Sequence, residues 1–114
     1  MLYLGRNGLG SAGLIALAPG LRARPQLRTL DLRSNGIGDD GVAALVAPGE
    51  GVLPALDELV LFNNQVSDAG CSALAALLSS GALPSLKDID LDDTPASGAA
   101  QEAVLTALAS RRGQ

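Results

Sequence analysis

One short apolar pattern recurs along the chain at nearly constant intervals. It consists of an aliphatic residue, a variable residue and a second aliphatic residue, and successive copies begin 28, 29 and 30 residues apart. The copies are Leu2-Tyr3-Leu4, Leu30-Asp31-Leu32, Leu59-Val60-Leu61 and Ile89-Asp90-Leu91. A unit of this length buries too little apolar surface to fold alone, so its copies must stack on one another. The period therefore predicts a repeat protein with one continuous core.

Other residue types recur at fixed offsets from the apolar pattern. An asparagine, a glycine and a leucine follow the first three copies in the same order, as Asn7, Gly13 and Leu17, then Asn35, Gly41 and Leu45, then Asn64, Gly70 and Leu74. Each unit closes with a proline two residues before a leucine, at Pro25, Pro54 and Pro84. So many aligned positions indicate one structural unit repeated along the chain.

The spacing within a unit predicts its local structure. The apolar pattern has a period of 2, which is typical of a short strand with both aliphatic side chains on one face. The asparagine follows the strand, where its amide can hydrogen-bond backbone groups that a tight bend leaves unpaired, so stacked units would form an asparagine ladder. Ser11, Asp39 and Asp68 are typical of helix starts, and aliphatic residues with helical spacing follow them. Each unit should consist of a strand, a bend, a helix and a loop that leads back to the next strand.

The segment Leu30–Gly41, which reads LDLRSNGIGDDG, resembles the ribonuclease-inhibitor type of leucine-rich repeat. This type also occurs in NOD-like receptors and Ran GTPase-activating proteins, and the resemblance covers nearly the whole chain. It implies an α/β leucine-rich-repeat solenoid, a horseshoe segment with short parallel strands on the concave face and helices on the convex face. We expect a single domain over residues 1–114 with about four coils, at about 2–29, 30–58, 59–88 and 89–114.

The two ends of the repeat differ from its middle. In the fourth unit Thr94 replaces the asparagine, Pro95 follows it and Ala100 replaces the glycine, so the ladder should end there. A helix over about 97–110, followed by Arg111 and Arg112, would complete this final coil, because cations suit a helix C-terminus. No polar capping segment precedes the first strand, and solenoids need capped ends. We therefore expect a part of a longer array, or self-association through the uncapped N-terminal coil.

Composition excludes several classes of function. The net charge of −4 disfavours nucleic-acid binding, and no apolar run is long enough to span a membrane. The chain has no histidine, the commonest general base and a frequent metal ligand. We expect no catalytic centre, metal site or cofactor. The lone Cys71 takes a helix position that is aliphatic in earlier units, which predicts a buried thiol. The absence of a second cysteine or a signal segment indicates the reducing cytoplasm or nucleus, and we expect a cytoplasmic protein.

The candidate binding residues are strand positions that point away from the core. They are Tyr3, Asp31, Arg33, Glu58, Val60, Phe62, Asp88, Asp90 and Asp92. Because successive side chains of a strand alternate between its faces, we expect these residues on the exposed concave face, with carboxylates outnumbering the single arginine. Such a surface would focus negative potential. The sequence thus predicts a non-catalytic scaffold for a protein partner with a basic surface, using Tyr3 and Phe62 as apolar anchors.

Alternative interpretations stay open. The acidic face could be merely solvated, or Asp88, Asp90 and Asp92 could bind calcium, although the glycine and glutamate of a calcium loop are missing and the segment reads as a strand. By resemblance, the chain could instead be a GTPase-activating or other regulatory fragment. It could also be a purely structural segment of a longer repeat array.

Overall fold

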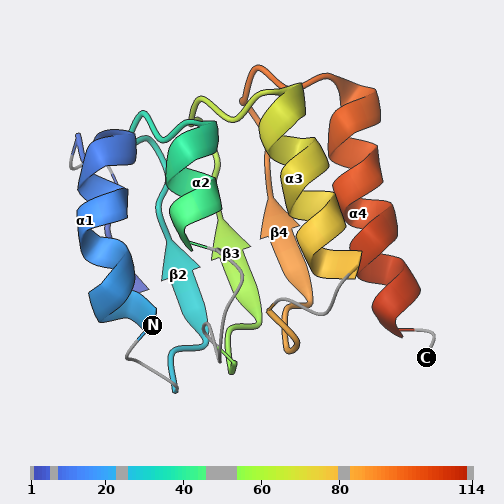
Figure 1. Cartoon of the computed structure of the whole chain (residues 1–114), viewed down its shortest axis with the longest axis horizontal. Coiled ribbons are helices and arrows are strands. Elements are labelled where there is room, and N and C mark those ends of the chain that lie inside the picture. The colour runs from blue at the N-terminus through green and yellow to red at the C-terminus, as the bar shows by residue number, and fades with distance from the viewer. Residues whose placement is uncertain (1, 6–7, 23–25, 46–53, 80–82, 113–114) are drawn as a thin grey trace.

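The computed structural model describes residues 2–5, 8–22, 26–45, 54–79 and 83–112. Within them, strands and helices alternate as β1 (Leu2–Tyr3), α1 (Gly10–Arg22), β2 (Thr29–Asp31), α2 (Asp39–Leu45), β3 (Glu58–Val60), α3 (Asp68–Ser79), β4 (Asp88–Asp90) and α4 (Gly98–Arg112). The strands form one parallel sheet in chain order, β1-β2-β3-β4. In Figure 1 the helices all lie in front of the sheet, so they cover the same face of it. Figure 1 shows the helices side by side in that order.

The register of the sheet confirms the alignment of the repeats. Leu30 pairs with Leu2 on one side and with Leu59 on the other, and Leu59 pairs with Ile89. Backbone bonds continue past the assigned strands, for example from Leu32 N to Val60 O at 2.9 Å. Equivalent residues of successive units therefore lie beside one another, as the period predicts.

Stacked aliphatic side chains form the core. Its completely buried members are mostly leucines, and those of the strands and bends are Leu30, Leu32, Ile37, Leu59, Leu61 and Val66. The helices supply the opposite wall with Leu14, Leu74, Leu78 and Val104. Burying a side chain of this size contributes about 1.5–3 kcal/mol relative to leaving it exposed. Repetition of similar aliphatic layers thus supplies the stabilisation that aromatic core residues provide in many other proteins.

The predicted asparagine ladder is present and runs between units. Asn64 Oδ1 accepts the N–H groups of Asn35 and Ile37 at 3.0 and 2.9 Å. Its Nδ2 donates to Leu32 O at 2.9 Å and to Leu61 O at 3.1 Å. Both asparagines are buried, so these bonds satisfy backbone groups that water cannot reach.

The ladder continues from this pair toward the first unit but not into the fourth. Asn35 accepts the N–H of Leu9 at 3.2 Å and donates to Leu4 O at 2.7 Å. In the fourth unit the Thr94 hydroxyl donates to Leu91 O at 2.9 Å, which replaces one of the asparagine's bonds within its own unit. The predicted first member, Asn7, lies outside the described residues.

A second ladder joins the starts of the helices. Helices α2 and α3 begin at Asp39 and Asp68 as predicted, whereas α1 begins at Gly10, one residue earlier than expected. The side chains at these starts bond to the next unit. Ser11 Oγ accepts Gly38 N–H at 2.7 Å, Asp39 Oδ1 accepts Ser67 N–H at 2.8 Å and Asp68 Oδ1 accepts Ser97 N–H at 2.6 Å.

The second ladder also stops in the fourth unit. The Ser67 hydroxyl adds a bond to Asp39, but the fourth unit begins its helix with Gly98, which has no side chain to offer. Helix α4 runs to Arg112, past the expected end near residue 110, and the side chains of Arg111 and Arg112 lie outside the description. Both ladders therefore mark the fourth unit as different from the others.

The recurring glycines are required by close packing within a unit and against the helix start of the preceding unit. A Cβ atom on Gly41 would lie 2.8 Å from Ile37 Cγ2, and one on Gly70 would lie 2.2 Å from Asp39 Oδ1. These contacts are too close for a larger residue unless the neighbouring side chains move. The glycines thus let each helix approach both its own bend and the helix start of the preceding unit.

Candidate protein-binding surface

The sheet face opposite the helices is called the strand face here, and it carries the side chains that alternate with the core leucines. Glu58, Asp88 and Asp92 are exposed on it, and Arg33, Phe62 and Asp90 are half-buried. Tyr3 pairs with Asp31 through the backbone of β1, but its side chain lies outside the description. Most of the predicted residues therefore come from neighbouring strands, as expected.

Two predicted residues are not exposed, and this expectation was wrong. Asp31 and Val60 have relative exposures of only 6% and 7%. Val60 lies between Asp31 and Asp90 in the register, so neighbours cover it on both sides. Asp31 is covered by Arg33, a residue of its own unit. Neither residue can offer much surface to a partner without movement of its neighbours.

Arg33 holds Asp31 through several hydrogen bonds. Its Nη2 donates to Oδ2 at 2.7 Å, its Nε lies 3.0 Å from both carboxylate oxygens, and its backbone N–H donates to Oδ1 at 3.2 Å. Burial alone raises the pKa of Asp31, but the hydrogen bonds and positive charge of Arg33 outweigh burial and hold that pKa below its ordinary value. The pair is therefore locally neutral.

The equivalent pair in the fourth unit has the opposite character. Asp92 N–H donates to Asp90 Oδ1 at 3.0 Å, the same turn that Arg33 and Asp31 form, but an aspartate takes the place of the arginine. Glu58 and Asp88 are direct partners in the register, so two like charges face each other across β3 and β4. Negative charge on the strand face is therefore concentrated on Glu58, Asp88, Asp90 and Asp92. We call these four residues the acidic half.

The acidic half does not form a metal site. Among the residues that the structure describes, no group of three or more Cys, Asp or Glu side chains is arranged to hold a metal ion. Asp88, Asp90 and Asp92 follow the strand backbone, which separates successive same-face side chains by about 6.8 Å. The calcium interpretation therefore has no supporting geometry in the described chain.

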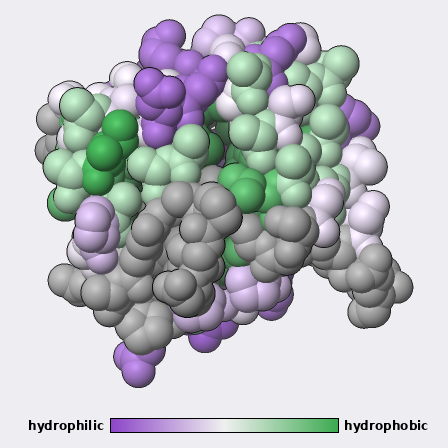
Figure 2. Space-filling view, viewed as in Figure 1, coloured by the Kyte–Doolittle hydropathy of each residue, from purple (hydrophilic) through white to green (hydrophobic). Residues whose placement is uncertain are grey.

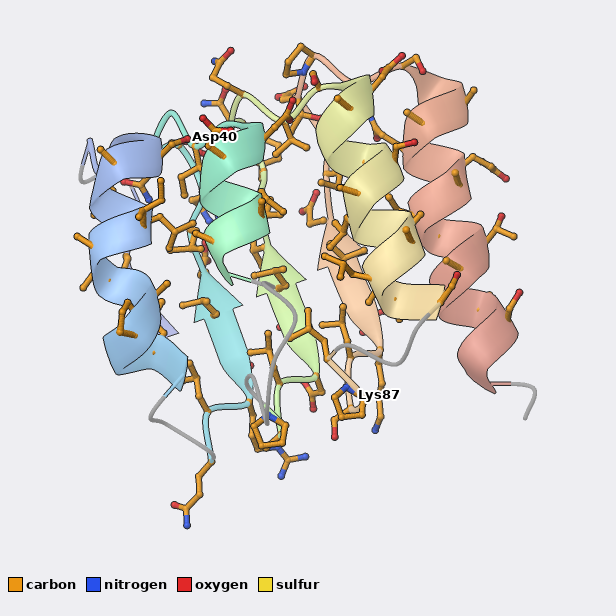
Figure 3. All side chains as sticks on the ribbon, in the orientation of Figure 1. Asp40 and Lys87 are labelled. Carbon is orange, nitrogen blue, oxygen red and sulfur yellow. The ribbon has the colours of Figure 1, made fainter. Side chains whose placement is uncertain are left out.

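Sequence reasoning missed a row of charges at the strand entrances. Arg28, Asp57 and Lys87 each precede a strand, and backbone bonds of 2.8 Å link Asp57 N to Arg28 O and Lys87 N to Asp57 O. Arg28 Nη2 lies 3.5 Å from Asp57 Oδ2. Figure 3 shows Lys87 at the lower edge of the molecule, at the opposite end from Asp40. The row borders the strand face with alternating charges, a feature that only the aligned register reveals.

The outer surface of the helices, called the helix face here, is less distinctive as a recognition surface. Figure 2 shows hydrophobic and hydrophilic residues mixed across it. A shallow hollow between α3 and α4 is lined by small or polar residues, namely Ala75, Ala76, Ser79, Ala99, Glu102, Ala103, Thr106, Ala107 and Ser110. Side chains this small provide few anchoring contacts for a partner.

The single cysteine has the predicted structural role. Cys71 is completely buried in the core. Burial, together with the nearby carboxylates of Asp68 and Asp39, raises the pKa of its thiol, so the reactive thiolate is disfavoured. Cys71 therefore acts as a small apolar core residue.

Comparison with known proteins supports the repeat assignment. A family model described as Leucine Rich repeat matches residues 2–18, 25–46 and 54–75, which together exceed half of the chain. No curated protein matches the sequence. None of the helices in the described residues is long and apolar enough to cross a membrane.

Proposed function

The chain belongs to the leucine-rich-repeat family, and from that premise we propose that it is a non-catalytic scaffold that binds a protein partner through its strand face. Repeats of this family generally mediate protein–protein interaction and typically carry no catalytic centre. This proposal also includes the ribonuclease-inhibitor type of repeat, the horseshoe curvature, the count of four coils and the cytoplasmic location. A fold alone does not specify a partner, whereas the side chains on its surface do.

The observation that carries the proposal is the unequal covering of the two sheet faces. The helices bury one face in the core, whereas the other presents Glu58, Asp88 and Asp92 as exposed side chains. Phe62, the one aromatic side chain that the described residues include, lies half-buried on this face. Interface cores favour aromatic residues, and a charged rim around one supplies specificity. The strand face thus combines an anchor with a charged surround.

The charge distribution favours a partner with a basic surface. Because Arg33 neutralises Asp31, the remaining charge of the strand face lies on the acidic half. Carboxylates concentrated on one surface attract Lys- and Arg-rich partners and speed their association. We place the partner's cations over β3 and β4, with an apolar side chain on Phe62.

A comparison of pull-downs from cytosol tests the proposal. The strand-face variant replaces Glu58, Phe62, Asp90 and Asp92 with serine. A matched control replaces four exposed helix-face residues, Ala76, Glu102, Ala103 and Thr106, with serine. We expect partners of the wild-type chain to be lost with the strand-face variant and retained with the control. If the strand-face variant retained the partners and the helix-face control lost them, the binding site would lie on the helices.

A structural role in a longer array is the second candidate, and the N-terminal unit favours it. Leu2, Leu4 and Leu9 are only partly buried, although their equivalents in the second unit are completely buried. A preceding repeat would cover them. If this were the chain's main role, the pull-down variants would behave alike, and adding the natural neighbouring repeats would raise the melting temperature. The GTPase-activating alternative is tested by GTP turnover of small GTPases with and without the chain.

A further inference from the structure

We propose that Asn35 is a site of spontaneous chemical modification, where deamidation breaks the asparagine ladder whenever the bend around it opens. Asn35 is followed by Gly36 in the sequence. A backbone nitrogen can attack the side-chain carbonyl carbon of the asparagine before it, and glycine, which has no side chain, hinders that approach least. The inference goes beyond the proposed function, because it concerns the integrity of the fold and not the recognition of a partner.

The reaction needs only water as a co-reactant. The Gly36 backbone nitrogen, after loss of its proton, forms a bond to Asn35 Cγ, and the side-chain amide leaves as ammonia. This step produces a cyclic imide. Water then opens the imide at either of its carbonyl groups, which gives aspartate or isoaspartate. The net change replaces an amide NH2 by a hydroxyl, so the product is a carboxylic acid that is ionised at neutral pH.

The folded bend opposes the reaction because it fixes the amide. Asn35 Nδ2 donates to the backbone oxygens of Leu4, Leu32 and Arg33 at 2.7, 3.1 and 3.2 Å. Its Oδ1 accepts the N–H of Leu9 at 3.2 Å. Asn35 is buried, so its side chain cannot turn toward the following nitrogen without the loss of several of these bonds. Deamidation therefore requires local opening of the bend.

The attacking group is placed differently from the group that it attacks. Gly36 is exposed beside the buried Asn35, and its φ is 68°. Ser34, on the other side of the asparagine, has a φ of 57°. A positive φ costs free energy for a residue with a side chain, and opening of the bend releases that cost. The hydrogen bonds of Asn35 are thus what holds this bend closed.

The products cannot replace asparagine in the ladder. A carboxylate has no N–H to donate, so its oxygens would face the carbonyl oxygens of Leu4 and Leu32, which are acceptors as well. A buried charge without a partner costs more than a lost hydrogen bond. Isoaspartate also lengthens the backbone by a methylene group. The bend should stay open after modification, which weakens the joint between the first and second units.

Asn64 provides a comparison within the same chain. It is as buried as Asn35, and its Nδ2 likewise donates to backbone oxygens, at 2.9 and 3.1 Å. The residue before it, Asn63, has the same φ of 57° as Ser34. Gln65 follows Asn64, however, and its side chain hinders attack by its own backbone nitrogen. The two ladder asparagines therefore share their surroundings and differ in the residue that follows.

Mass spectrometry of the aged chain tests the inference. The chain is incubated at mildly alkaline pH, folded or in guanidinium chloride, and fragmentation of its proteolytic peptides assigns each conversion to a residue. We expect conversion of Asn35 to be about tenfold faster or more in guanidinium chloride, which corresponds to an opening free energy of about 1.4 kcal/mol or more. Asn64 should convert much more slowly than Asn35 in the unfolded chain. Conversion of Asn7 is counted separately, because Asn7 also precedes a glycine but lies outside the described residues.

Two variants change the following residue and leave both asparagines in place. Gly36→Asn keeps a residue type that tolerates a positive φ, and a Cβ atom at this position meets nothing within 4 Å, so the fold should persist. Its side chain should slow the conversion of Asn35 several-fold in the unfolded chain. Gln65→Gly should raise the conversion of Asn64 to the rate of Asn35 in the unfolded chain. Circular dichroism verifies that both variants fold.

A third variant supplies the product directly. We expect Asn35→Asp to melt at a lower temperature than Asn35→Ala, because a buried charge adds to the loss of the same hydrogen bonds. Thermal unfolding measures both variants beside the wild type.

Each contrary result overturns the inference. Equal rates for Asn35 in the folded and unfolded chains would show that the ladder does not control the reaction. Unchanged conversion in Gly36→Asn, or slow conversion of Asn64 in Gln65→Gly, would show that the following residue does not determine the site. An Asn35→Asp variant as stable as the wild type would mean that the modification leaves the ladder intact. None of these measurements depends on a bound partner, so this inference and the proposed function fail independently.

Discussion

Asn64 and Asn35 lie 29 residues apart in sequence and are joined by a 3.0 Å hydrogen bond from the backbone N–H of Asn35 to the side-chain Oδ1 of Asn64. Both residues are buried at the bend that follows a strand. The bond links one unit to the next at a place where water cannot substitute for a lost partner. Stability of the bends is therefore shared between neighbouring units.

We expect Asn35→Ala to lower the free energy of unfolding by roughly 1–3 kcal/mol, because it leaves buried backbone groups without partners. Urea unfolding measures the loss. Gln65→Ala changes an exposed residue close to the same bend and serves as the control, with an expected change within about 0.5 kcal/mol. Equal stability of the two variants would contradict the ladder.

Leu32→Ala tests the stacked core. Leu32 is completely buried between the strands and the helices, so truncation should leave a cavity and cost about 2–5 kcal/mol. Leu105→Ala removes the same atoms from an exposed position and should cost much less. The comparison uses thermal and urea unfolding, and a small loss for Leu32→Ala would mean that the layer around it is misplaced.

The Asp31–Arg33 pair predicts a pH dependence of stability. The pKa of Asp31 is lower in the folded chain than its ordinary value, so its carboxylate stabilises the fold above about pH 4. That contribution is lost as the pH falls below the ordinary value and through the lowered pKa of the folded chain. Arg33→Ala should remove this part of the acid dependence and lower stability at neutral pH. Melting curves between neutral and acid pH measure both effects, and an unchanged acid slope would argue against the pairing.

Asp90→Asn should behave differently from Asp31→Asn. Asp90 faces Asp92 where Asp31 faces Arg33, so removal of its charge relieves repulsion and leaves an oxygen that can still accept the Asp92 N–H. We expect stability to stay within about 0.5 kcal/mol of the wild type or to rise slightly. Asp31→Asn, by contrast, should destabilise the chain because it removes the buried carboxylate that the half-exposed Arg33 binds. Similar losses for both variants would mean that Asp90 is paired as well.

Much of the fold could be predicted from the sequence because the repeat supplies the register. Alignment of Leu30 with Leu59 in the printed sequence predicts their pairing in the sheet, and the recurring asparagine predicts the ladder. The helix-start ladder could not be foreseen from one unit. Ser11 and Asp39 look like ordinary caps until the neighbouring unit is placed beside them.

The binding surface was harder to predict than the fold. Strand alternation correctly placed Glu58 and Asp88 on an exposed face, but it also placed Asp31 there. Alternation gives only the direction of a side chain. It does not reveal that Arg33, two positions away, folds over the carboxylate and buries it. The partner itself is not encoded in any local pattern.

The most direct test of the strand face as a recognition surface is site-specific photocrosslinking in cytosol. A photoreactive residue replaces Phe62 in one variant and Thr106, on the helix face, in the other. We expect a discrete crosslinked protein from position 62 that is absent from position 106 and weakens as salt rises. A discrete product from position 106 with none from position 62 would contradict the proposal and assign recognition to the helix face.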